Sequence, residues 1–181
     1  MRKVVAYELV SLDGVAEDPD AFILDWDDAM DANLARVIAT QDTVLLGRRM
    51  YDEWSRFWPE SDIQPFADFI NNVEKHVMSS TPLTSSWAKT TVHHGDGASL
   101  IGDLKGRAGG DIGVHGSVEL ARSLLREGLI DELQLVVAPM MRASGRRLFD
   151  DVASTRLTLS SSEVSPSGYL LLGYQVGDRV D

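Results

Sequence analysis

Short apolar segments alternate with segments of helical periodicity along most of this 181-residue chain, and this alternation limits the fold more than any other feature. The first segment, 2–10, is apolar almost throughout, which is typical of a strand covered on both faces. The next, 27–40, places apolar residues from Met30 to Ile38 at the spacing of one helical face. Strands that alternate with helices predict a parallel sheet with helices on both sides.

The same pattern continues along the chain. Further strands are expected at 43–46, 75–78, 90–93, 111–115 and 133–138, and further helices at 49–54, 65–72, 98–105 and 118–127. Ser117 is a suitable N-cap for the last of these helices, and Gly128 suits its C-terminal end. The segments 156–164 and 169–176 flank a short turn and predict a closing antiparallel hairpin. We therefore expect one domain over 1–181, an α/β fold of three αβα layers with a mostly parallel mixed sheet of about eight strands.

Composition excludes several classes of partner and site. The formal net charge of −11 disfavours nucleic-acid binding, which depends on Lys and Arg neutralising phosphates. No cysteine is present, so disulfides, thiolate metal sites and cysteine nucleophiles are excluded. Glu8 interrupts the first apolar run too early for a signal peptide, and no run approaches the ~20 apolar residues of a membrane span. We expect a cytoplasmic protein that acts on a small molecule, with no metal, membrane or nucleic-acid partner.

Three of the expected strand-to-helix turns carry residues suited to phosphate. They combine glycine, serine and arginine at Gly47, Arg48, Arg49, Ser79, Ser80, Gly116, Ser117 and Val118. Ligands of open α/β sheets bind beyond the carboxyl ends of the strands, where helix N-termini present unpaired N–H groups that favour phosphate. Arginine adds bidentate hydrogen bonds. Each turn alone is ordinary turn chemistry, but the three together in an acidic chain predict a nucleotide with several phosphates.

The order of these turns resembles the dihydrofolate reductase superfamily. More specifically, it resembles the reductase (C-terminal) domain of the bifunctional deaminase–reductase of riboflavin biosynthesis and its stand-alone relatives. The segments that carry the resemblance are Ser11-Leu12-Asp13-Gly14, Gly47-Arg48-Arg49-Met50-Tyr51, Ser79-Ser80, Gly116-Ser117 with Leu120, Gly128-Leu129-Ile130-Asp131-Glu132-Leu133, and Pro139 followed by Gly145-Arg146-Arg147-Leu148-Phe149. The resemblance implies a dihydrofolate-reductase-like fold with NADPH lying across the sheet edge.

The resemblance also implies roles for the three turns. It gives phosphate contacts to Gly47, Arg48 and Arg49, the 2′-phosphate of adenosine to Ser79 and Ser80, and the pyrophosphate to Gly116, Ser117 and Val118. The family usually has glycine at the second position of the third turn, where this chain has Ser117. Cations and hydroxyls at the 2′ position favour NADPH over NADH.

The substrate side is expected near Asp13, which follows the first strand, and at the start of the first helix. Dihydrofolate reductases carry a tryptophan and, five residues later, an acid on this helix, a spacing that Trp26 and Asp31 match. Asp31 is the predicted proton donor and Asp13 a predicted catalytic residue that orients substrate, although aspartate also suits the first turn of any helix. Tyr51 and Trp54 lie one turn apart and either line the substrate pocket or pack in the core.

Other polar residues admit two interpretations. His93 and His94 point to opposite faces of a strand and are expected to form a surface pair. His115 is expected to be a core histidine with a hydrogen-bond partner, with a cofactor contact as the alternative. Three loop arginines bind a substrate phosphate or stay solvated: Arg142, Arg146 and Arg147. The apolar segment 133–138 belongs to a central strand or contributes to a homodimer interface.

The sequence thus predicts an NADPH-dependent reductase similar to 5-amino-6-(5-phosphoribosylamino)uracil reductase, which transfers hydride to a small polar substrate. A deaminase domain is excluded because its zinc signature requires cysteine. Two alternatives stay open. One is an authentic dihydrofolate or pteridine reductase, and the other is a nucleotide-binding module without turnover.

Overall fold

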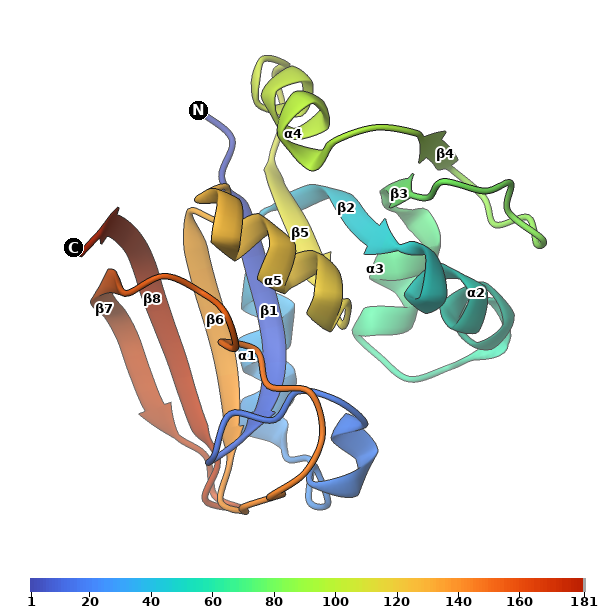
Figure 1. The fold of residues 1–181 in the computed structure, drawn as a ribbon. Coiled ribbons are helices and arrows are strands. Elements are labelled where there is room, and N and C mark those ends of the chain that lie inside the picture. The colour runs from blue at the N-terminus through green and yellow to red at the C-terminus, as the bar shows by residue number, and fades with distance from the viewer. Residues whose placement is uncertain (181) are drawn as a thin grey trace.

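A computed structural model describes residues 1–180 as an eight-stranded sheet flanked by helices (Figure 1). The strands are β1 (Val4–Ser11), β2 (Gln41–Gly47), β3 (Glu74–Met78), β4 (Thr90–His93), β5 (Asp111–His115), β6 (Glu132–Ala138), β7 (Thr155–Val164) and β8 (Leu170–Arg179). The helices are α1 (Asp28–Ile38), α2 (Arg48–Phe57), α3 (Phe66–Asn72), α4 (Gly97–Lys105) and α5 (Val118–Glu127), with short 3₁₀ turns at Pro19–Ala21 and Trp58–Glu60.

The strand order is β4-β3-β2-β5-β1-β6-β8-β7. Pairing is parallel from β4 through β6 and antiparallel for β6–β8 and β8–β7. The expected α/β architecture, with a mostly parallel mixed sheet and a closing antiparallel hairpin, is therefore confirmed. Strand and helix positions also agree with the sequence pattern, with shifts of a few residues at some ends.

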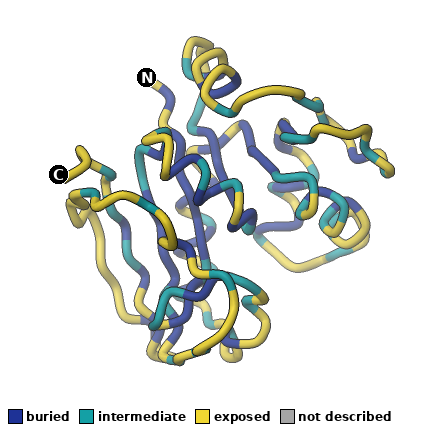
Figure 2. The backbone as a smooth tube through the Cα atoms, in the orientation of Figure 1, coloured by how far each residue is buried: buried dark blue, intermediate teal, exposed yellow. Residues whose placement is uncertain are grey.

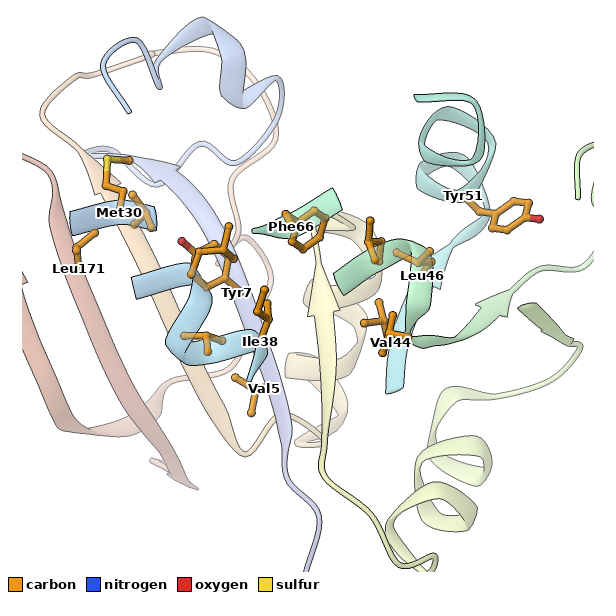
Figure 3. Close-up of a cluster of buried hydrophobic side chains, with 14 of the residues drawn as sticks. Val5, Tyr7, Met30, Ile38, Val44, Leu46, Tyr51, Phe66 and Leu171 are labelled. Atoms are coloured by element: carbon orange, nitrogen blue, oxygen red, sulfur yellow. The ribbon is translucent and has the colours of Figure 1, made fainter. Parts of the chain in front are cut away.

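Two apolar clusters cover the two faces of the sheet. Side chains of β1 alternate between them, so that Val5 and Tyr7 belong to one cluster and Val4 and Ala6 to the other. The first cluster packs against α1 and α3, and Figure 3 shows part of it; the second packs against α4 and α5. Burial on both faces explains why the central strands are apolar throughout.

The sheet is covered unevenly. The central strands are buried along most of their length, whereas β7 is exposed over nearly all its residues (Figure 2). The strand β6 lies between β1 and β8, and its side chains are mostly buried. This central position accounts for the apolar sequence of 133–138. No helix among residues 1–180 combines the length and apolarity needed to cross a bilayer.

Local sequence explains the helix ends near the predicted site. The carboxylate of Asp27 caps α1 by accepting from the N–H groups of Ala29 and Met30. Gly128 ends α5 at a φ of 71°, a left-handed conformation that favours glycine. Ser117 is the N-cap residue of α5 as expected, but the expected capping hydrogen bond from its side chain is absent. Its side chain makes no capping bond, because the hydroxyl instead accepts from the N–H of Gly47.

Candidate functional site

A crevice between β1 and β5 marks the ligand end of the sheet by topology alone. The β1–β5 ladder ends at the pair Tyr7–His115, whereas β1 continues along β6 to the pair Ser11–Ala138. The chain leaves β1 toward α1 on one face and leaves β5 into α5 on the other. Adjacent parallel strands whose connections leave to opposite faces open a crevice at their carboxyl ends, the usual ligand position in such sheets.

The three predicted turns meet beside this crevice. They follow β2, β3 and β5, which are neighbours in the sheet, and β2 and β3 end in register at Gly47 and Met78. The Gly47 N–H donates to the Ser117 hydroxyl at 3.1 Å, which joins the first turn to the third. The guanidinium of Arg48 donates to the Ser79 hydroxyl at 3.4 Å, which joins the first turn to the second. The structure therefore brings together the turns that the sequence suggested.

The third turn is close-packed and leads into a helix N-terminus that no side chain caps. Gly116 has a φ of 62°, and a Cβ atom there would lie 2.8 Å from the Trp54 ring. Only glycine fits this position without displacing the tryptophan. Because no side chain caps α5, the N–H groups of its first turn, beginning at Val118, are available to an anion.

The two arginines of the first turn have different surroundings. Arg48 pairs with Asp52 at 2.7 Å and also donates to the Thr81 and Pro82 carbonyl oxygens. Its guanidinium therefore holds the 79–82 turn. Arg49 is exposed and lies within 4 Å of no carboxylate among residues 1–180. Of the two, Arg49 is the cation available to a ligand.

Asp13 joins two loops at the end of β1. Its carboxylate accepts from the backbone N–H groups of Arg142 and Ala143, both at 2.9 Å, and from the Ser11 hydroxyl at 2.6 Å. The Ser11 and Arg142 hydrogen bonds hold the pKa of Asp13 well below its usual range. The carboxylate is thus an ionised acceptor occupied by the protein itself, so it orders the loops around the crevice.

The loop arginines are tied to these same loops. Arg146 pairs with Glu17 at 2.8 Å and lies 3.4 Å from Glu119 at the start of α5. Arg147 donates to the Asp13 carbonyl oxygen at 3.1 Å. Both side chains therefore have protein partners. The Nε atom of Arg142 is buried without a hydrogen-bond partner among the described residues.

Trp26 and Asp31 are in direct contact. The indole Nε1–H donates to the Asp31 carboxylate at 2.7 Å, across the five-residue spacing noted in the sequence. Asp31 is half-buried in the first turn of α1, and Trp26 is 38% exposed. An indole bond to one carboxylate oxygen leaves further acceptor sites on the group, so the pair can hold both a proton and a ligand.

Of the two interpretations of Tyr51, the structure favours packing in the core over lining a pocket. Its side chain is 1% exposed, and its hydroxyl donates to the Ser85 carbonyl oxygen at 3.1 Å. Tyr51 packs into the core because the α2 face that carries it turns toward Trp87. Trp54 is half-buried against Phe66 and Gly116, so it supports the third turn rather than forming an open wall.

The histidines are structural in this fold. His115 is 2% exposed and contacts the Gln41 side-chain oxygen at 2.7 Å; burial lowers its pKa to about 3 and keeps it neutral. The interpretation as a core histidine is confirmed. The surface-pair expectation is wrong for His93, which is half-buried and lies 2.6 Å from a His76 ring nitrogen. His94 is exposed and contacts the Ser79 carbonyl oxygen.

Two buried polar residues of β1 were not recognised as site candidates. Tyr7 and Glu8 are 6% and 2% exposed, and the Tyr7 hydroxyl and the Glu8 Oε1 have no hydrogen-bond partner among residues 1–180. Burial raises the pKa of Glu8 to about 8. The sequence does contain a signal for them, because Tyr7 and Glu8 are polar residues within a strand that is otherwise apolar on both faces. Their positions, at and just beyond the last β1–β5 pair, place them at the crevice.

Two other features of the structure lie outside this arrangement. The described residues contain no cluster of three or more His, Asp or Glu side chains able to hold a metal ion. A hollow of about 410 Å³ is lined by Ile130, Phe149 and Val176, among others. It lies near the amino end of β6, away from the carboxyl ends where the turns meet.

Comparisons with known proteins agree with this geometry. The sequence model of the RibD C-terminal domain matches residues 2–171. An uncharacterized Bacillus subtilis protein, YwjB, is 29% identical over 167 residues, which cover 90% of this chain and 91% of YwjB. A Shewanella sp. PV-4 protein named for riboflavin biosynthesis superimposes with a TM-score of 0.78 at 20% identity, covering 97% of this chain and 99% of that one.

Two more distant structures have names that state an activity. The Thermotoga maritima diaminohydroxyphosphoribosylaminopyrimidine deaminase/5-amino-6-(5-phosphoribosylamino)uracil reductase gives a TM-score of 0.68 at 14% identity, over 97% of this chain and 56% of that one. Enterococcus faecalis dihydrofolate reductase, complexed with NADP(H), gives 0.65 at 15% identity over 97% of each chain. At these identities the similarity establishes a dihydrofolate-reductase-like fold.

Proposed function

This chain belongs to the RibD C-terminal domain family, and from that membership we propose that it is an NADPH-dependent reductase that transfers hydride to a small polar substrate. The observation that carries the proposal is the meeting of three phosphate-suited turns at one sheet edge, beside the crevice between β1 and β5. A family whose structural neighbours include reductases, one of them complexed with NADP(H), supports the same activity.

The residues of the three turns fit such a cofactor. The uncapped N-terminus of α5, preceded by Gly116 at a positive φ, suits a pyrophosphate that approaches the backbone closely. The exposed guanidinium of Arg49 and the exposed Ser80 hydroxyl suit the additional 2′-phosphate. When bound, the cofactor supplies the hydride, and the protein supplies position and a proton.

The protein's part of the reaction falls to groups at the end of β1 and the start of α1. The loops joined by Asp13 shape the substrate side of the crevice. Asp31 holds the proton that joins the substrate heteroatom next to the carbon that receives hydride, and Trp26 orients the Asp31 carboxylate. Solvent returns the proton to Asp31 after turnover.

Fluorescence titration and NADPH absorbance test the proposal together. The 2′-phosphate gains charge-assisted bonds worth roughly 1.5–3 kcal/mol each, so NADPH is expected to bind at least tenfold more tightly than NADH. Equal dissociation constants would remove the 2′-phosphate assignment. Acceptors should include dihydrofolate and the ribosylaminouracil named for the Thermotoga enzyme. Tight binding without oxidation of NADPH by any acceptor would instead indicate a nucleotide-binding module.

One observation favours a pteridine substrate as the second candidate. The Trp26–Asp31 hydrogen bond reproduces the tryptophan–acid pair that the sequence shares with dihydrofolate reductases. Faster oxidation of NADPH with dihydrofolate than with the ribosylaminouracil would favour this candidate. The reverse order would favour a pyrimidine substrate.

A further inference from the structure

The Tyr7 hydroxyl is a buried donor that the fold leaves unused. Tyr7 is 6% exposed, and its hydroxyl has no hydrogen-bond partner among residues 1–180. Buried tyrosine hydroxyls normally have a partner, and an unpaired one destabilises the folded state. Tyr51 is the internal comparison, since it is equally buried but its hydroxyl donates to the Ser85 carbonyl oxygen. A phenylalanine would satisfy the packing around Tyr7 without this cost.

Tyr7 lies at the point of the sheet where the crevice between β1 and β5 begins. Tyr7 forms the last β1–β5 pair, opposite His115, and their rings lie 5.8 Å apart. Its side chain lies on the α1 face of the sheet, among Met30 and Ile38 of α1 and Phe66 of α3 (Figure 3). This is the face that carries Asp31, the predicted proton donor.

The charge state of Tyr7 restricts what the hydroxyl can do. Burial and, after it, the negative charge of Asp31 raise its pKa above the usual range, so the group stays a neutral O–H. A neutral phenol can donate a hydrogen bond to an acceptor atom of a ligand while keeping its own proton.

We propose that the Tyr7 hydroxyl is a substrate-binding group that donates a hydrogen bond to a carbonyl oxygen or ring nitrogen of the substrate. The inference rests on the proposed reductase function and narrows its substrate to a heterocycle with an acceptor atom near the reduced carbon. The bond holds this end of the heterocycle on the face of the sheet that α1 covers, the helix whose first turn carries Asp31. Tyr7 therefore acts on substrate position, whereas Asp31 acts on the proton.

The first test uses ligand-free protein and compares Tyr7→Phe with the matched variant Tyr51→Phe. Tyr7→Phe removes a hydroxyl that has no partner, so the melting temperature should stay unchanged or rise. Tyr51→Phe removes the donor to the Ser85 carbonyl oxygen and should lower the melting temperature. The loss of one hydrogen bond in a chain of this size corresponds to a decrease of roughly 2–4 °C in the melting temperature. If Tyr7→Phe lowers the melting temperature as much as Tyr51→Phe, the hydroxyl is used by the fold and the inference is wrong.

The second test separates substrate binding from cofactor binding in the full-length protein. With an acceptor that the wild type reduces, Tyr7→Phe should raise KM about tenfold, the loss of one hydrogen bond, and leave the NADPH dissociation constant unchanged. An unchanged KM in a variant that still oxidises NADPH would overturn this inference and leave the proposed function intact. A wild type that oxidises NADPH with none of the acceptors overturns the proposed function, and this inference with it.

Discussion

At the scale of single residues, three carboxyl groups near the end of β1 have three different environments. Asp13 is held ionised by backbone N–H groups, Glu8 is buried without a partner for one of its oxygens, and Asp31 accepts from an indole while staying half-buried. Environment, not residue type, determines which of them can give up a proton during a reaction. Their variants should therefore differ in what they change.

Asp31→Asn should lower turnover by something like 10²–10⁴-fold and leave NADPH affinity unchanged, because it removes the proton and not a cofactor contact. The asparagine side-chain oxygen can still accept from Trp26, so the helix start should keep its geometry. The matched control is Asp28→Asn, an exposed acid in the same helical turn that contributes only to the helix dipole. Full activity of Asp31→Asn with every reduced acceptor would show that Asp31 is a helix-end charge.

Glu8 should make the stability of the protein depend on pH. Its carboxyl has a pKa of about 8 in the folded chain and about 4.3 in an unfolded one, so only the folded state keeps the proton between these values. The stability contribution of the neutral group is therefore complete below about pH 4 and is lost as the pH rises toward about 8. Relative to Glu8→Gln, the wild type should lose several degrees of melting temperature over this interval.

Thermal unfolding at acidic, neutral and mildly alkaline pH measures this difference. Glu163→Gln, which changes an exposed glutamate of β7, is the control and should show no such trend. A constant difference between wild type and Glu8→Gln across the interval would mean that Glu8 is solvated or paired. The quantity to compare is how the difference in melting temperature changes with pH. Its absolute value is not used, because the buried amide of Glu8→Gln itself has unmet hydrogen bonds, which lower stability at every pH.

At the scale of elements, the positions of the strand ends could be predicted from the sequence better than the contacts that individual side chains make. Parallel strands place their carboxyl ends at one edge, so the pattern of strands and helices alone predicts that the turns at Gly47, Ser79 and Gly116 lie along the same edge of the sheet. The same pattern does not predict which group each side-chain hydroxyl forms a hydrogen bond with. Ser117 has the sequence of an N-cap, yet it bonds Gly47 on a neighbouring strand 70 residues away, a contact that no local pattern contains.

The two tyrosines show the same limit. Tyr51 lies on a helix and Tyr7 on a strand, and both belong to the same apolar cluster. Local periodicity shows that each faces the core but not which hydroxyl meets a partner there. That depends on Ser85, which reaches Tyr51 through a loop with no regular pattern. The tyrosine singled out in the sequence was therefore the one whose hydroxyl the fold already uses.

The first turn supports a prediction about its two arginines. Arg49→Ala should weaken NADPH binding at least tenfold and leave the melting temperature unchanged, since Arg49 is exposed and has no carboxylate within 4 Å among residues 1–180. Arg48→Ala should lower the melting temperature, because Arg48 holds Asp52 and the 79–82 turn. Fluorescence titration with NADPH measures the affinity of both variants, and thermal unfolding measures their melting temperatures. Equal losses of affinity without a stability change in Arg48→Ala would show that both guanidinium groups contact the cofactor.

At the scale of the whole molecule, the strand order was the feature that the sequence left open. Alternation of strands and helices predicted the layers and the hairpin, but nothing local indicated that β5 inserts between β2 and β1. That insertion creates the crevice and determines which turns face it. A fold of known order, suggested by resemblance, provided this information where periodicity could not.

We propose that the protein forms a homodimer through the exposed edge of the sheet. Within residues 1–180 the strand β7 pairs only with β8, and its side chains include the exposed Leu157 and Leu159. An unpaired edge with exposed apolar residues is a ready surface for a second copy. Light scattering should give twice the monomer mass, and Leu159→Lys should give the monomer, whereas Ile63→Lys, equally exposed in a loop, should not. A monomeric wild type across micromolar concentrations would contradict this.

The central place of β1 also bears on how the protein is made. Within this domain β1 is synthesised before its neighbours at 111–115 and 132–138, so neither of its edges is paired until more than 100 further residues, Leu12 to His115, have been made. At ordinary rates of synthesis that wait is on the order of 10 s, during which its apolar residues stay exposed. The segment that forms β1 is therefore one to which a chaperone has time to bind, and the crevice forms only after β5 and β6 have been made.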